Sequence, residues 1–145
     1  MTRAEYEASI CARLAQGVEV PFVEVALDGW TPRIAGCHEN VDAWVEAYPD
    51  FAAVRGWVIH MSFGPLGNGL TAHSVVRTPN GALIDITPIK MGAPRGGLFV
   101  EHEGDDALFF AMKALGIEMQ CLKFNVDQPE MDSFLSMIQA HSEEE

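Results

Sequence analysis

The sequence predicts an α+β fold in a single domain, with helices packed on a largely antiparallel central sheet. Three observations predict it. Amphipathic helical periods lie near both ends of the chain, runs rich in β-branched and aromatic residues cluster in the middle, and a turn with hairpin chemistry joins two of those runs. The 145 residues, of which 48% are apolar, suffice for a normal core, and no repeat or long linker divides residues 1–145 into two domains.

The first predicted elements are a helix and a strand. We expect a helix over residues 2–16, because Thr2 can cap it and Glu5 stands at the capping-box position. Residues 18–27 then form a predicted edge strand, since Pro21 cannot donate a hydrogen bond to a central ladder.

A second helix is predicted to begin at Cys37. Apolar residues return there at the helical period, and Pro49 follows where the helix must stop. The predicted core stripe of this helix consists of Cys37, Val41, Trp44, Val45 and Tyr48.

The remaining chain alternates between strand and helix patterns. Strands are predicted at residues 54–63, 70–78, 82–88, 98–101 and 117–126. A helix capped by Asp105 or Asp106 lies before the last of these strands, and another, opened by Asp127, lies after it. Strands in the middle and helices at both ends complete the α+β prediction.

The turn between the two middle strands decides which side chains share a face. Residues 79–81 (proline, asparagine, glycine) suit a three-residue loop, because glycine takes the left-handed third position. Such a loop pairs Thr78 with Ala82. His73 and Asp85 then become diagonal neighbours on one face, roughly 7–8 Å apart between backbones. A two-residue loop would instead place them on opposite faces.

The excess of acidic residues argues against some partners. With 9 Lys+Arg against 21 Asp+Glu the formal net charge is −12, which opposes binding to nucleic acid and to anionic membranes. No apolar run approaches the ~18 residues of a membrane span. Three widely spaced cysteines do not form a disulfide framework, so we expect a cytoplasmic protein. The sequence leaves the oligomeric state open.

Cys37, His73 and Asp85 form a candidate catalytic set. Cys37 follows a glycine at a predicted helix start, where the positive end of the helix favours a thiolate. His73 and Asp85 supply a base and a group that orients it, which is the order of parts in thiol-based acyl transfer. Cys37 could equally be a buried core residue of its helix, as most free cysteines are.

Other polar residues are candidates for binding the substrate. His38 is next to the thiol, Asn40 lies in the same helical turn, His60 lies on the preceding strand, and Thr87 shares the hairpin face with His73. Each also has a structural interpretation as a capping, edge or surface residue. His102, between two glutamates, is expected to be exposed.

A metal site is an alternative use of the same residues. Cys37, His73 and Asp85, together with His60 or His38, have side chains that zinc accepts as ligands. No closely spaced ligand pair such as CxxC or HxxxH supports it. The sequence also lacks the phosphate-binding and dinucleotide-binding glycine motifs, so no cofactor is predicted.

Two segments resemble the transglutaminase-like and papain-like cysteine enzymes. They are residues 72–76 (AHSVV) and 80–88 (NGALIDITP), where a histidine strand turns through glycine into a strand that carries an aspartate. The resemblance, which spans residues 36–88, implies a papain-like or transglutaminase-like core with Cys37 as nucleophile, His73 as base and Asp85 as orienter. The chain departs from the family pattern at His38, where an aromatic residue is common, and lacks the glutamine that papain-like enzymes place before the cysteine.

Two main hypotheses follow. The first is a thiol-dependent enzyme whose Cys37 attacks an amide or ester substrate, by hydrolysis, deamidation or acyl transfer. The second is a non-catalytic binding or interaction domain on the same scaffold, in which Cys37 is buried and inert. The sequence does not identify the substrate.

Overall fold

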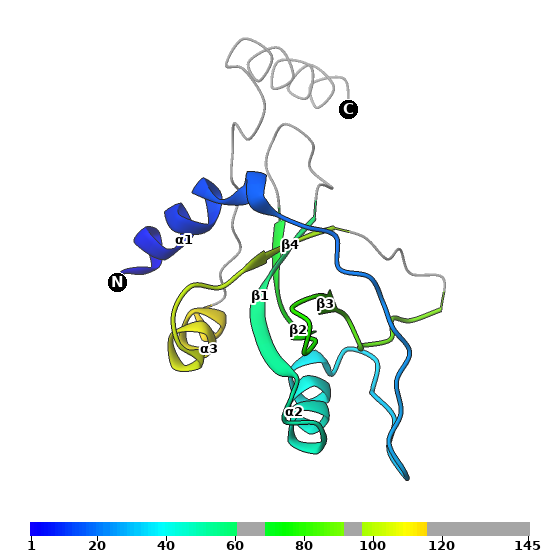
Figure 1. Cartoon of the computed structure of the whole chain (residues 1–145). Coiled ribbons are helices and arrows are strands. Elements are labelled where there is room, and N and C mark those ends of the chain that lie inside the picture. The colour runs from blue at the N-terminus through cyan, green and yellow to red at the C-terminus, as the bar shows by residue number, and fades with distance from the viewer. Residues whose placement is uncertain (61–68, 92–96, 116–145) are drawn as a thin grey trace, which may run out of the picture.

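The computed structural model describes residues 1–60, 69–91 and 97–115 of the chain (Figure 1). In these residues the predicted α+β class is confirmed. The sheet has the order β3-β2-β1-β4, and every pair of neighbours is antiparallel. Its strands are β1 (Ala52–His60), β2 (Gly69–Arg77), β3 (Leu83–Ile84) and β4 (Leu98–Glu101). The α-helices are α1 (Arg3–Ala12), α2 (Cys37–Ala47) and α3 (Asp106–Ala114), and the 3₁₀ helix η1 (Leu14–Gln16) follows α1.

The helix starts agree with the capping chemistry of the sequence. Thr2 accepts a hydrogen bond from the Glu5 N–H at 3.1 Å, while the Glu5 carboxylate accepts one from the Thr2 N–H at 3.2 Å, which completes the predicted capping box. Asp105 caps α3 by accepting from the Leu108 N–H at 2.9 Å. No helix among the described residues is long and apolar enough to cross a membrane.

The helices cover one face of the sheet. Trp57 and Val76 both point to this face, because strand side chains alternate and Trp57 pairs with Ala72. Trp57 packs in a core cluster with residues of α1 and α3, and Val76 packs in a second cluster with Val41 and Trp44 of α2. The second cluster fixes α2, and therefore Cys37, against β2.

The opposite face is covered by an extended segment instead of helices. Val54, Val75 and Phe99 form the core on this side, with Val20 packed against them. Residues 18–27, predicted to be a strand, form only isolated bridges, which include Val18 to Phe99. The strand prediction is therefore wrong; a continuous ladder does not form, in keeping with a proline at position 21 that has no N–H to donate. The segment contacts this face through Val20, and its end packs against the cluster of Val41 and Trp44 through Val25 and Leu27.

The hairpin turn is confirmed in detail. Gly81 has φ 91°, and the Gly81 N–H donates to the Thr78 carbonyl at 2.9 Å. The Thr78 N–H donates to the Ala82 carbonyl at 2.8 Å, so the register is the predicted one and Val76 pairs with Ile84.

The second strand of the hairpin is shorter than the predicted 82–88. β3 ends at Ile84 because the next residue changes partner. The Asp85 N–H donates to the Pro21 carbonyl at 2.8 Å, and the Val23 N–H donates to the Asp85 carbonyl at 2.9 Å. The backbone of Asp85 is thus bonded to the extended segment and not to β2.

Four further expectations are resolved or fall outside the described residues. His102 is 8% exposed and not on the surface, so that expectation is wrong. Cys11 is disulfide-bonded, contrary to the expectation of free cysteines. The strand predicted at 117–126 and the helix predicted from Asp127 lie outside the described residues.

Candidate active site

Cys37 is the first residue of α2, as predicted. Its side chain is 9% exposed, and it is the free cysteine among the described residues. Gly36 occupies the N-cap position and has no side chain, so it does not cap the N–H groups in the first turn of α2. Ala35 has φ 63°, a left-handed conformation that costs a non-glycine residue about 1–2 kcal/mol, and forms part of the turn into the helix.

His73 and Asp85 form the predicted pair. The His73 Nε2–H donates to Asp85 Oδ2 at 2.8 Å, and the two side chains are 19% and 16% exposed. The other carboxylate oxygen of Asp85 accepts from the Thr87 N–H at 3.0 Å. Both oxygens therefore have donors, which fixes the carboxylate and leaves His73 Nδ1 available for a second partner.

Two imidazoles, those of His38 and His73, lower the pKa of Cys37. Burial raises the pKa of Cys37, but hydrogen bonds to His38 and His73 and the charges of both rings outweigh burial and lower it from 9.0 to about 6. Burial lowers the pKa of His73, but hydrogen bonds to Asp85 and Cys37, with their negative charges, raise it from 6.5 to about 9. Between about pH 6 and pH 9 the site therefore holds a thiolate beside an imidazolium.

His38 is held by a network around the buried Arg55, which the sequence did not indicate. His38 Nδ1 lies 2.6 Å from Ser74 Oγ, which also accepts a hydrogen bond from Arg55 Nη1 at 2.8 Å. Arg55 is itself buried and pairs with Asp42 at 2.6 Å and Asp106 at 3.4 Å. The signal in the sequence was a lone arginine within an apolar strand, and its partners come from β2, α2 and α3, which no local pattern connects.

Asn40 and Thr87 connect the helix of the thiol to the Asp85 loop. The Asn40 amide donates to the Arg33 carbonyl at 2.8 Å and to Thr87 Oγ1 at 3.1 Å, and its oxygen accepts from the Arg33 N–H at 2.9 Å. Asn40 is 2% exposed, so all of these bonds are protected from water. These contacts are structural, and a role of His38, Asn40 or Thr87 toward a substrate stays a prediction.

His60 is the last residue of β1, and its side chain is outside the described part of the chain. Among the described residues, no group of three or more histidine, cysteine, aspartate or glutamate side chains is arranged to hold a metal ion.

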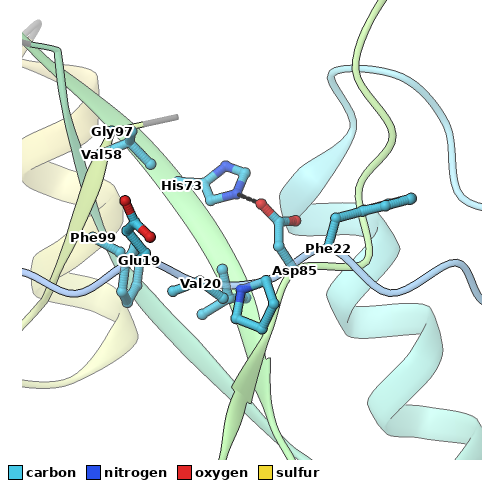
Figure 2. Close-up of a pocket in the computed structure, with 10 residues that line it drawn as sticks. Glu19, Val20, Phe22, Val58, His73, Asp85, Gly97 and Phe99 are labelled. Carbon is cyan, nitrogen blue, oxygen red and sulfur yellow. Dashed lines mark hydrogen bonds and ion pairs between the residues drawn. The ribbon is translucent and has the colours of Figure 1, made fainter. Parts of the chain in front are cut away.

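A cavity of about 300 Å³ lies beside the His73–Asp85 pair (Figure 2). Phe99, Val58, Val75 and Val20 form its apolar walls, and Glu19 lies at its edge. The Phe99 ring reaches this position because Gly56, directly across from His73 on β1, has no side chain: a Cβ there would come within 2.5 Å of the ring. Cys37 is not among the described residues that line the cavity. His73 lines the cavity and also acts on the thiol, so its ring lies between the two.

Comparisons with protein-family models, with curated proteins and with solved structures found no match to this chain. The resemblance to transglutaminase-like and papain-like enzymes therefore stays a prediction from the residues themselves.

Proposed function

We propose that the chain is a thiol-dependent acyl-transfer enzyme that acts on an amide or ester, in the manner of the transglutaminase-like and papain-like enzymes. One observation carries the proposal: a thiol with a pKa lowered to about 6 adjoins an imidazole whose other nitrogen is hydrogen-bonded to a carboxylate at 2.8 Å. A core cysteine without a chemical role needs neither of these partners.

The first half of the proposed reaction forms an acyl-enzyme. The Cys37 thiolate attacks the substrate carbonyl, a C–S bond forms, and the N–H groups at the start of α2 stabilise the oxyanion. His73 then gives its proton to the leaving amine or alcohol as the C–N or C–O bond breaks, and Asp85 keeps the ring oriented.

The second half regenerates the thiolate. Water or another nucleophile attacks the thioester while His73 takes its proton, and the C–S bond breaks. Hydrolysis, deamidation and acyl transfer differ only in the leaving group or in this acceptor, so the same residues serve all three.

Acylation of the thiol tests the proposal directly. We expect p-nitrophenyl acetate to release p-nitrophenolate and to leave one acetyl group on Cys37, located by mass spectrometry of the peptides. Cys37→Ala should abolish both signals, and Cys37→Ser should lower the rate because the hydroxyl is a weaker nucleophile. Release of p-nitrophenolate that persists in Cys37→Ala would overturn the assignment of the nucleophile.

A non-catalytic binding domain is the second candidate, and one observation favours it. The thiol is only 9% exposed and does not line the cavity beside His73. An inert Cys37 would be acetylated no faster than a free thiol at the same pH, so the same experiment separates the two functions.

A further inference from the structure

The cavity beside His73 contains one carboxylate that no described residue neutralises. Glu19 lies on the Phe99 side of the hollow, across from Asp85 (Figure 2). Asp85 is bonded to His73 and to the Thr87 N–H, whereas none of the residues that the structure describes forms an ion pair with Glu19. The charge of Glu19 is therefore available to a ligand.

The rest of the cavity suits an alkyl chain. Four of its walls are the apolar side chains of Val20, Val58, Val75 and Phe99, and no lysine or arginine is among the described residues that line it. An anionic group in this place would be repelled by Glu19 and by the net charge of −12 of the whole chain. A cationic group would be attracted by both. The His73 imidazolium also lines the cavity, but its charge is already paired with Asp85.

We propose that this cavity binds the acyl chain of the substrate and selects one that ends in a positive charge, such as a lysine-like alkyl amine. The inference rests on the proposed function, because the chain must be joined to a carbonyl that reaches Cys37. The methylene groups would pack against Phe99 and the valines, and the ammonium group would pair with Glu19 at the edge of the hollow. Glu19 would thus determine specificity without taking part in bond making.

Three esters of equal chain length test the inference. They are the p-nitrophenyl esters of 6-aminohexanoate, of heptanoate and of adipate, whose chains end in a cation, a methyl group and an anion. Each acylates Cys37 by forming a C–S bond and breaking the C–O bond to p-nitrophenolate, so the released colour gives the rate. We expect the cationic ester to react roughly two- to fivefold faster than the neutral one, since Glu19 is exposed to water. The anionic ester should be the slowest.

Glu46 supplies a matched control. It is an exposed glutamate on α2 that does not line the cavity, so Glu46→Gln changes the net charge as much as Glu19→Gln does. Glu19→Gln should bring the cationic-to-neutral ratio close to one, and Glu19→Lys should reverse the order of the cationic and anionic esters. Glu46→Gln should keep the preference of the unmodified chain.

The outcomes separate this inference from the proposed function. If all three esters acylate Cys37 at equal rates, or if Glu19→Gln and Glu46→Gln change the ratio equally, the selectivity is overturned and the enzyme assignment stands. If no ester acylates Cys37, both are overturned. A preference that weakens as salt is added supports a direct charge interaction.

Discussion

The replacement His73→Ala gives the sharpest test of the thiolate–imidazolium pair. It removes one of the two rings that lower the pKa of Cys37 and leaves His38 and its Ser74 partner in place. We expect the pKa of Cys37 to rise from about 6 towards its ordinary value of 9.0. The rate of alkylation by iodoacetamide, followed at Cys37 by mass spectrometry across pH, reports this change.

The size of the effect follows from the two pKa values and from nucleophilicity. At pH 6 a thiol with a pKa of about 6 is half ionised, whereas one with a pKa of 9.0 is ionised to roughly one part in a thousand. A thiolate of lower pKa is intrinsically less nucleophilic, by a factor of about 15–30 over this interval. The unmodified chain should therefore react roughly 15–30 times faster than His73→Ala at pH 6 if the pKa returns fully to 9.0, and only about 3–6 times faster at pH 7.

The shape of the profile carries as much information as the rates. The unmodified chain should show a rise centred at about pH 6, where Cys37 ionises, and a second inflection at about pH 9, where His73 loses its proton. His73→Ala should show one rise at higher pH. Two profiles that superimpose, both centred near pH 9, would refute the reasoning, because His73 would then have no influence on the thiol.

Three other predictions concern stability, measured by urea unfolding. Tyr6→Phe should lower the free energy of unfolding by ~1–3 kcal/mol, because it leaves two buried nitrogens unsatisfied. The Tyr6 hydroxyl accepts a hydrogen bond from Trp57 Nε1 at 2.8 Å and lies 2.7 Å from His102 Nδ1. Tyr48→Phe, at an exposed tyrosine, is the control, and equal losses in the two variants would contradict the role of this network. Asn40→Ala should lose ~1–3 kcal/mol through its bonds to Arg33 and Thr87, against a change within ~0.5 kcal/mol for the exposed neighbour Glu39→Ala. Asp85→Asn should have a free energy of unfolding up to ~3 kcal/mol below that of the unmodified chain at pH values below about 6.5, because the pKa of His73 is raised from 6.5 to about 9. That difference in stability should shrink as the pH rises through about 9, where His73 loses its positive charge. A difference independent of pH would mean that Asp85 does not stabilise the His73 imidazolium.

Local chemistry made part of the site predictable. The glycine at position 81 fixed the loop length, the loop length fixed the register, and the register placed His73 and Asp85 on one face. The helical period placed Cys37 at the start of α2 in the same way. Each of these inferences needs only neighbours within a few residues along the chain.

Contacts between distant segments were not predictable. The pairing of β1 with β2 brings Arg55 opposite Ser74, and no turn chemistry in the sequence sets that register. His102 was expected on the surface because of its acidic neighbours, yet Tyr6, 96 residues earlier, satisfies one ring nitrogen and the Asp105 carbonyl the other. Burial of a polar residue depends on whether such partners exist, and the local sequence does not contain them.

The two backbone bonds of Asp85 make the site depend on chain that precedes the thiol. Pro21 and Val23 dock Asp85 from a segment that contributes no group to the proposed chemistry. A shortened chain that starts at α2 would keep the sulfur, the imidazole and the carboxylate, but would lose the two backbone hydrogen bonds that hold Asp85 in place. The presence of all three triad residues is therefore a poor guide to activity in a shortened chain, because the extended segment at residues 18–27 holds the carboxylate in position.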